Sequence, residues 1–283
     1  GLCVAGLMTA ATALIADYWE EPARSRLFGL RASFMAGGGV AFLVAAGFLA
    51  EWSWRGPFLV YLAAFPLLPL LWRAVQEPPP RRHHPDAPPP SRGLPAGWPL
   101  LALVCGVAIL NRTAFYLMPL ELPFLVQSRT GSGAGAAGIA IAVMPLTGAV
   151  ASAFYGRLRR RLSFPLVGAL GLALVAAGVA LTAHATSYPA ILVTVAVSGL
   201  GVGLVMPNLN AWSLAVVPED WRGRAAGLVT ASIFLGQFVS PLLTRPLIEL
   251  LGTPGTFLAV GGFVAVVAGA LAWARPGKGA FLD

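Results

Sequence analysis

Gly1-Leu-Cys-Val-Ala-Gly-Leu-Met8 returns in altered form as Gly199-Leu-Gly-Val-Gly-Leu-Val-Met206, and the agreement continues without a gap at an offset of 198 residues. Over positions 1 to 38, eleven positions carry the same residue in both copies, which is more than a composition rich in Ala, Gly and Leu should give. Each copy has the form of an apolar run, an Arg-bearing loop and a second apolar run. Such copies are typical of parallel repeats in a membrane, so two similar helical bundles are predicted.

The composition indicates the class of protein. Hydrophobic residues make up 57% of the chain, charged residues only 11%, and the mean hydropathy is +0.77. We expect an all-α membrane protein, because the apolar runs lack the period-two alternation of barrel strands. Nine runs have about the 20 residues that a helix needs to cross the bilayer core. They are residues 2–18, 27–50, 54–73, 98–126, 134–156, 165–186, 188–217, 225–248 and 256–274.

The basic residues gather on one side when the nine spans alternate across the bilayer. Fifteen of the 19 Lys and Arg residues follow the odd-numbered spans. By the positive-inside rule this side is cytoplasmic, in a cell membrane that we expect to be a bacterial cytoplasmic membrane. The net charge of +8 then reflects topology. A nucleic-acid partner is not expected, because the chain offers no folded basic surface.

The number of spans is odd, whereas a parallel duplication should give two equal sets. The seventh span matches the first, and three spans of the second copy precede the seventh while none precedes the first. The chain also opens on Gly1 rather than Met, so we expect about nine of twelve helices to be present. The expected organisation is half of an N-terminal bundle at 1–76, a linker at 77–96 and a C-terminal six-helix bundle at 97–283.

The linker between the third and fourth spans is rich in proline and has no apolar periodicity, so it is predicted to be a solvated cytoplasmic tether. His83 and His84 lie within it. Adjacent histidines in a tether lack further converging ligands, so no metal site is predicted.

Four motifs follow one another along the chain. The first span ends in Asp17-Tyr-Trp and leads into Glu21-Pro-Ala-Arg-Ser-Arg26, which returns as Pro218-Glu-Asp-Trp-Arg-Gly-Arg224. Trp54-Arg-Gly-Pro-Phe58 opens the third span, and Gly156-Arg-Leu-Arg-Arg-Arg-Leu-Ser163 follows the fifth. With the repeat and the central linker, these motifs resemble the major facilitator superfamily of secondary transporters over the whole chain. The resemblance implies a gating role for Asp17, Arg24, Arg26, Gly156, Arg160, Arg222 and Arg224.

The resemblance also implies two six-helix bundles that enclose a cavity near the bilayer midplane, opened alternately to each side. The run Tyr116-Leu-Met-Pro-Leu-Glu-Leu-Pro-Phe124 looks like efflux-type members of the family. We therefore expect proton-coupled efflux of a small amphipathic solute. Antiporters of the family usually carry a Gly-Pro pair that Gly39–Gly47 lacks, so import of an organic anion with protons remains the alternative.

Two charged residues stand within the fourth span. Arg112 lies about 18 Å along a helix counted from Leu100, near the bilayer midplane, where a guanidinium is costly unless it is paired or faces water. It is predicted to hold an anionic group of the substrate or to pair with a proton-carrying acid in the cavity; the alternative is a structural ion pair between helices. Glu121, closer to the outer interface, is a candidate for proton coupling or an outer-gate carboxylate. Arg245 and Glu249 are predicted to pair.

Neutral polar residues within the spans are further candidates. Thr12, Asn208, Asn210 and Gln237 are predicted to line the substrate cavity, with inter-helix hydrogen bonding as the alternative. Asn208 and Asn210 flank Pro207, so either of them could instead satisfy carbonyls freed by that proline. The glycines at 37–39 and 199–203 are predicted to permit close helix approach.

Other classes of protein find less support in the sequence. It contains no Gly-x-Ser-x-Gly elbow, no phosphate-binding loop and no histidine spacing for a catalytic metal, so neither an enzyme nor a cofactor is expected. A channel or a membrane scaffold remains the alternative from another class, although no polar face continues through several spans. The expected partners are a small-molecule substrate, the lipid bilayer and protons, and the protein is expected to be a monomer.

Overall fold

The computed structural model describes residues 23–74, 93–95 and 97–273, together with Leu7, Ala10, Ala11, Leu14, Ile15, Tyr18 and Trp19. Every regular element within these residues is helical, as expected of an all-α membrane protein. In chain order they are α2 (Ala23–Trp52), η1 (Gly56–Ala64), α3 (Leu67–Ala74), α4 (Trp98–Thr130), α5 (Ala134–Arg159), α6 (Phe164–Thr182), α7 (Tyr188–Ala215), η2 (Glu219–Trp221) and α8 (Arg222–Trp273). Six helical segments in this part of the chain are long and apolar enough to cross a membrane.

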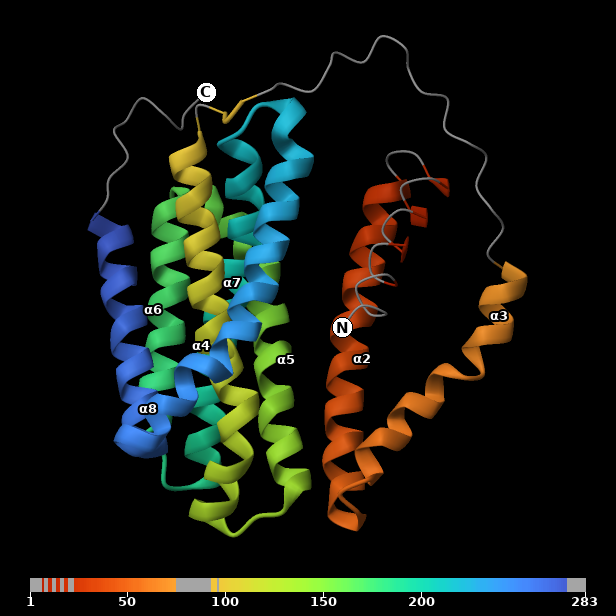
Figure 1. The fold of residues 1–283 in the computed structure, drawn as a ribbon, viewed down its shortest axis with the longest axis vertical. Helices are drawn as coiled ribbons and strands as arrows, with labels where there is room; N and C mark the ends of the chain where they lie inside the picture. The colour runs from red at the N-terminus through yellow and green to blue at the C-terminus, as the bar shows by residue number, and fades with distance from the viewer. Residues whose placement is uncertain are drawn as a thin grey trace.

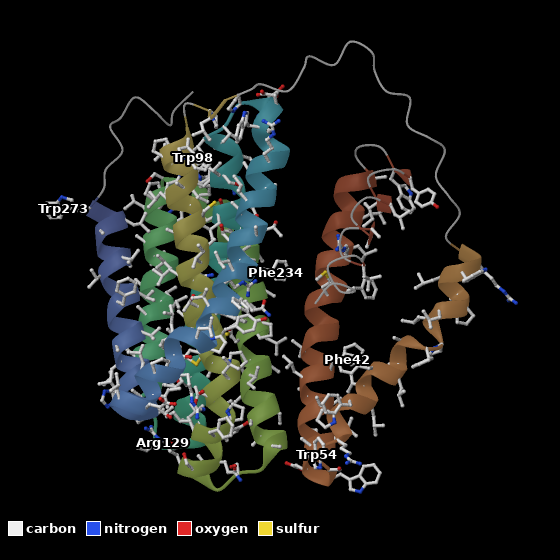
Figure 2. All side chains as sticks on the ribbon, in the orientation of Figure 1. Phe42, Trp54, Trp98, Arg129, Phe234 and Trp273 are labelled. Atoms are coloured by element: carbon white, nitrogen blue, oxygen red, sulfur yellow. The ribbon has the colours of Figure 1, made fainter. Side chains whose placement is uncertain are left out.

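The ends of the central helices follow local sequence signals. Ser163 precedes α6 and Ser187 precedes α7, and in both helices proline occupies the first turn, where its missing N–H removes no helical hydrogen bond. Gly131 ends α4 with a φ of 66°, a conformation that favours glycine. Because these turns are short, successive helices run antiparallel, and Trp98 and Arg129 lie at opposite ends of the bundle (Figure 2).

The helices α4 to α7 confirm the four spans predicted for this part of the chain. The predicted boundaries of the Arg-bearing loops are wrong. The helix α2 already begins at Ala23, α8 begins at Arg222, and α5 continues past Gly156. Arginine is a good helix former, and its stem can lie along an apolar surface while the guanidinium reaches water. Hydropathy alone therefore places these helix ends wrongly.

The span predicted at 54–73 is divided in two. Its first part is the 3-10 helix η1, and its second part is the α-helix α3. Pro57 stands in the first turn of η1 and Pro66 separates the two helices. Proline supplies no N–H and restricts the residue before it, so a continuous α-helix is broken here. Together the two helices still form an apolar segment of 18 residues that could cross a membrane.

The helix α8 contains both of the last predicted spans. Its helical path breaks at Gly252, where φ is 69° and ψ is 171°, a conformation open chiefly to glycine. The chain reverses direction at this break (Figure 1). The first predicted span, at 2–18, lies mostly outside the described residues.

One helix boundary repeats together with the sequence. Moved by the 198-residue offset, the end of α2 at Trp52 falls two residues before the break at Gly252 within α8. This coincidence supports a parallel duplication.

In the C-terminal bundle, α7 packs between α5 and α6 through glycines on two of its sides. A Cβ added at Gly148 of α5 would lie 3.2 Å from the carbonyl oxygen of Gly199, and one at Gly171 of α6 would lie 3.1 Å from that of Gly201. Close approach at the α7 glycines is therefore confirmed. On α2, an added Cβ at Gly37–Gly39 would meet no atom of the described residues within 4 Å, so close approach there stays a prediction.

Candidate functional site

A cavity of about 300 Å³ lies where α2 faces the C-terminal bundle. We call it the central cavity. Residues of α2, α4, α5 and α7 line it, and α5 is the helix of the C-terminal bundle that packs against α2 (Figure 1). Its lining residues are Met35, Gly39, Leu43, Phe115, Tyr116, Met118, Pro119, Leu122, Ile141, Met144, Pro145 and Val195.

Three of the five methionines in the chain converge on the central cavity. Met35 comes from α2, Met118 from α4 and Met144 from α5. The methionine side chain is flexible and polarizable, so it adapts to apolar partners of different shape. Tyr116 supplies the only hydroxyl group among the lining residues. The cavity therefore suits a solute that is mostly apolar and carries few polar groups.

A second cavity, of about 380 Å³, lies between α2, α4 and α5 toward the turn at residues 131–133. We call this end of the molecule the outer end, since the basic residues predict that it faces away from the cytoplasm. Leu43 and Ile141 line both cavities. These two side chains therefore lie between the central cavity and the outer end.

At the outer end, α2 and α5 are in close contact. A Cβ added at Gly47 would lie 3.1 Å from the Cα atom of Gly138. One residue from the start of α5, the backbone N–H of Gly135 donates a hydrogen bond of 2.8 Å to Oε1 of Glu51. A carboxylate at a helix N-terminus is stabilised by the unpaired N–H groups and by the helix dipole. Glu51 thus joins α2 to the first turn of α5.

Arg112 lies in the middle of α4, one turn before the cavity-lining Phe115 and Tyr116. Its guanidinium carbon Cζ is 5.0 Å from the centre of the Phe115 ring. Its Nε is buried and has no hydrogen-bond partner, and Arg112 forms no ion pair with any residue that the structure describes. Its charge is thus available to a ligand at the edge of the cavity, or to a group outside the described residues.

Asn111, beside Arg112, was missed by the sequence analysis. Its side chain is fully buried, with Nδ2 3.8 Å from the sulfur of Met206 and with Oδ1 unpartnered in the described part of the chain. The signal was visible in the sequence, because Asn111 and Arg112 are adjacent polar residues deep within an apolar span. The middle of α4 therefore carries two polar side chains with unused hydrogen-bonding capacity.

Glu121 belongs to a different cluster from Arg112. It is half-buried and interacts electrostatically with Arg245 of α8. Arg245 Nε lies 3.1 Å from Oε1 of Glu249, which confirms the predicted pair. Glu121 is nine residues, or about 13–14 Å, further along the helix than Arg112. It does not line the central cavity, and its role in proton coupling stays a prediction.

The prediction that Asn208 lines a substrate cavity is wrong. The side chain is fully buried. Its Nδ2 donates a hydrogen bond of 3.0 Å to the carbonyl oxygen of Phe164, and its Oδ1 accepts one of 3.4 Å from the hydroxyl of Tyr155. Asn208 therefore joins α7 to α6 and α5. A buried amide within an apolar bundle finds its partners on neighbouring helices, which was the alternative considered for it.

The remaining cavity candidates stay predictions. Asn210 is exposed on α7 and Gln237 is half-buried on α8, and neither lines the two cavities described above. Thr12 and Asp17 lie outside the described residues.

The predicted gating residues of the second copy make local contacts. Arg222 forms an exposed ion pair of 3.1 Å with Glu219, and the Cζ atom of Arg224 lies 4.9 Å from the ring centre of Trp221. Gly156 lies within α5 and Arg160 caps its C-terminal end. In the first copy, Arg24 and Arg26 lie in the first turn of α2, and only their backbone is described.

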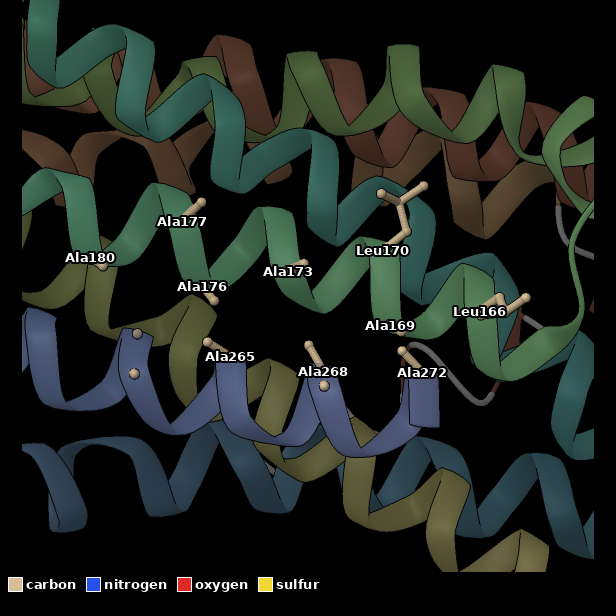
Figure 3. A pocket seen from close by; sticks show the side chains of 13 residues that line it. Leu166, Ala169, Leu170, Ala173, Ala176, Ala177, Ala180, Ala265, Ala268 and Ala272 are labelled. Atoms are coloured by element: carbon tan, nitrogen blue, oxygen red, sulfur yellow. The ribbon is translucent and has the colours of Figure 1, made fainter. Parts of the chain in front are cut away.

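A groove of about 620 Å³ between α6 and the last part of α8 is a poor candidate for a solute site. Figure 3 shows that short side chains from both helices line it, among them Ala173, Ala176 and Ala268, with Leu166 and Leu170 at one end. All of its lining residues are Ala, Gly or Leu. It offers no side-chain group that could orient a solute, so it is better explained by close packing of small residues.

No metal site emerges from the described residues, which contain no group of three or more His, Cys, Asp and Glu side chains placed to hold an ion. His83 and His84 lie outside this part of the chain.

An all-α set of apolar helices, an internal repeat and a cavity between α2 and the C-terminal bundle define a multi-pass membrane protein built from duplicated helical units. The family model for the Major Facilitator Superfamily matches residues 1–241, and a second match covers residues 104–280. The chain belongs to the major facilitator superfamily.

Proteins similar to the chain include a transporter of Escherichia coli and a protein of solved structure. The "Uncharacterized transporter YebQ" of Escherichia coli (strain K12) is 27% identical over 182 residues, a match that covers 62% of this chain and 40% of YebQ. The chain thus matches less than half the length of this relative. The solved structure is a bacterial homologue of the human lysosomal transporter Spinster, in an inward-facing and unoccupied conformation. It superposes with a TM-score of 0.68 at 17% identity, over 92% of this chain and 72% of that one, which shows a shared fold.

Proposed function

We propose that the chain belongs to a secondary active transporter that moves a small amphipathic organic solute across the membrane by alternating access. The observation that carries this proposal is the central cavity. It is bounded by α2 on one side and by the C-terminal bundle on the other, and three methionines line it. A solute held between two helix sets can be released to either side when the sets move relative to each other.

The outer end of the molecule supports this mechanism. The contact between Gly47 and Gly138 and the hydrogen bond between Glu51 and Gly135 close α2 against α5 there. Both contacts join a helix of the first repeat to a helix of the second. Separation of these contacts would open the path past Leu43 and Ile141 to the central cavity, so they would form the outer gate.

Export with protons as the coupling ion is our proposal for the direction of transport. The run at 116–124 resembles efflux-type members of the family, and Tyr116, Met118, Pro119 and Leu122 from this run line the central cavity. Glu121 is the proposed proton carrier. The proposed setting is a bacterial cytoplasmic membrane, with the protein acting as a monomer.

Import of an organic anion is the second candidate, and Arg112 favours it. Its buried Nε has no hydrogen-bond partner among the described residues, and the guanidinium is suited to bind a carboxylate through two parallel hydrogen bonds. The two candidates differ in the charge of the solute, which can be measured directly.

The test is transport by the purified protein in proteoliposomes under an imposed pH gradient, with ethidium as the lipophilic cation and carboxyfluorescein as the organic anion. Gly39 lines the central cavity, and a Cβ added there meets nothing within 4 Å in the structure, so the side chain of Gly39→Phe can start without a backbone clash and should fill part of the cavity. Gly37→Phe is the matched control, since Gly37 is equally open on the same helix and does not line the cavity.

We expect gradient-driven movement of ethidium that Gly39→Phe abolishes and Gly37→Phe retains. Movement of carboxyfluorescein alone would support the second candidate instead. Equal transport by Gly39→Phe and Gly37→Phe would show that the central cavity is not the solute path.

A further inference from the structure

Four arginines lie close together at the turn between α5 and α6, opposite the outer end. Arg159 is held within the protein. Its Cζ atom lies 3.6 Å from the ring centre of Phe164, and its NH1 group donates a hydrogen bond of 2.9 Å to the carbonyl oxygen of Leu162. The other three side chains, Arg157, Arg160 and Arg161, are exposed and form no ion pair within the described part of the chain. Three positive charges are thus left without a carboxylate partner.

These three arginines border a groove of about 820 Å³, which we call the arginine groove. Apart from the arginines, its lining is entirely apolar. The walls come from α5 and α6, and α7 forms the floor. The lining residues are Ala151, Phe154, Arg157, Leu158, Arg160, Arg161, Leu174, Leu200 and Leu204.

The packing of α7 explains why the groove exists. Gly199 of α7 meets α5 at Gly148, and Gly201 of α7 meets α6 at Gly171. Because α5 and α6 are each drawn onto α7, they make little contact with one another. The space between them stays open near the turn that joins them, and Leu200 and Leu204 are left at its base.

The combination of groups points to one kind of ligand. A guanidinium binds phosphate oxygens through paired hydrogen bonds, so three arginines at the mouth of the groove favour a phosphate group. The apolar interior favours a hydrocarbon chain rather than a soluble metabolite. The basic residues predict that this end faces the cytoplasm, where the membrane leaflet carries anionic lipids, and basic pockets between transmembrane helices bind such headgroups.

We propose that the arginine groove binds an anionic phospholipid of the cytoplasmic leaflet. The phosphate contacts Arg157, Arg160 and Arg161, and one acyl chain lies along Leu200 and Leu204. The site is separate from the central cavity, because the two share no lining residue. The lipid would bridge α5 and α6. Of these two helices, only α5 packs on α2.

The test is native mass spectrometry of the purified protein with phosphatidylglycerol and phosphatidylcholine of identical acyl chains. The wild type should retain phosphatidylglycerol preferentially. An arginine near an anionic surface contributes about fivefold in affinity. The combined variant Arg157→Gln, Arg160→Gln, Arg161→Gln should therefore lose on the order of a hundredfold in preference. Arg222→Gln, which removes an exposed arginine on α8, is the matched control and should keep the preference.

A second variant tests the apolar part of the groove. Leu200→Trp adds bulk at its floor and leaves all three arginines in place, so it should weaken retention of both lipids. Glycerophosphate, which has the headgroup chemistry without acyl chains, should bind much more weakly than the lipid. The proposal would be overturned by equal retention of the two lipids in the wild type, by an unchanged preference in the triple variant, or by glycerophosphate binding as tightly as the lipid. Elution of each variant at the wild-type volume in size-exclusion chromatography excludes misfolding.

Discussion

The contact between α2 and α5 predicts a specific effect of Gly138→Val. A Cβ at this position would lie 2.9 Å from the carbonyl oxygen of Leu43 and 3.1 Å from the Cα atom of Gly47. Both distances are shorter than an ordinary van der Waals contact. Since valine adds two methyl groups beyond Cβ, α2 and α5 must move apart at the outer end.

The free-energy cost of overpacking sets how far Gly138→Val shifts the balance between closed and open molecules. Extra carbon atoms in a close contact cost about 1–3 kcal/mol, and the cost applies only while the outer end is closed. The ratio of closed to open molecules should therefore fall by about five- to 150-fold. Gly106→Val on α4 is the control, because a Cβ there meets nothing within 4 Å in the structure.

The assay is the rate at which a membrane-impermeant maleimide labels a single cysteine at Ala137, in a background without Cys3 and Cys105. Ala137 is 4% exposed and lines the outer of the two cavities, so its labelling should report opening. Gly138→Val should raise the rate at least fivefold, while Gly106→Val should leave it unchanged. Equal rates in the two variants, with both proteins folded, would refute the outer gate.

Three further predictions follow from other contacts. Glu51→Ala should raise the labelling rate at the same cysteine by up to about fivefold, since a carboxylate at a helix N-terminus stabilises the closed outer end by about 0.3–1 kcal/mol. An unchanged rate would show that the hydrogen bond between Glu51 and Gly135 does not hold the gate closed. Arg112→Lys and then Arg112→Ala should give a graded loss of transport at constant expression if the guanidinium binds a carboxylate. If Arg112 is instead one half of a structural pair, Arg112→Ala should be poorly folded. Gly201→Ala should lower the free energy of unfolding by about 1–3 kcal/mol, because the new Cβ overlaps α6. Gly269→Ala, at an open position, should leave it unchanged, and equal melting temperatures of the two variants would contradict the packing argument.

The number and type of helices in the second half of the chain could be predicted from the sequence, because lipid requires long apolar helices whatever their neighbours are. The internal repeat predicted which helices correspond, and the end of α2 agrees with the break at Gly252 of α8 at the 198-residue offset. Helix ends were less predictable, since Arg24 and Arg222 can continue a helix as readily as they can occupy a loop. The break between η1 and α3 was signalled by Pro66, but a hydropathy window averages over it.

The site was harder to predict than the fold. Arg112 was found because a charge is conspicuous in an apolar span. Asn208 was misplaced because an amide within a span can face a cavity or a neighbouring helix, and only the rotation of α7 against α5 and α6 decides which. Phe115 and Met144 were missed, because an apolar residue that lines a cavity cannot be distinguished by its type from one that lies in the core or faces lipid. Which residues line the central cavity is decided by how the helices are arranged, and residue type alone does not reveal it.

The arrangement of charges on α4 restricts how protons and solute can be coupled. Arg112 stands next to the central cavity without an ion-pair partner among the described residues, whereas Glu121 lies about 13–14 Å away and interacts with Arg245. A proton on Glu121 therefore cannot neutralise Arg112 directly. If transport is proton-coupled, then either the electrostatic interaction of Glu121 with Arg245 changes together with the outer gate, or a carboxylate from the solute or from outside the described residues pairs with Arg112. Glu121→Gln separates these cases: it should abolish the dependence of transport on the pH gradient in the first and leave it intact in the second.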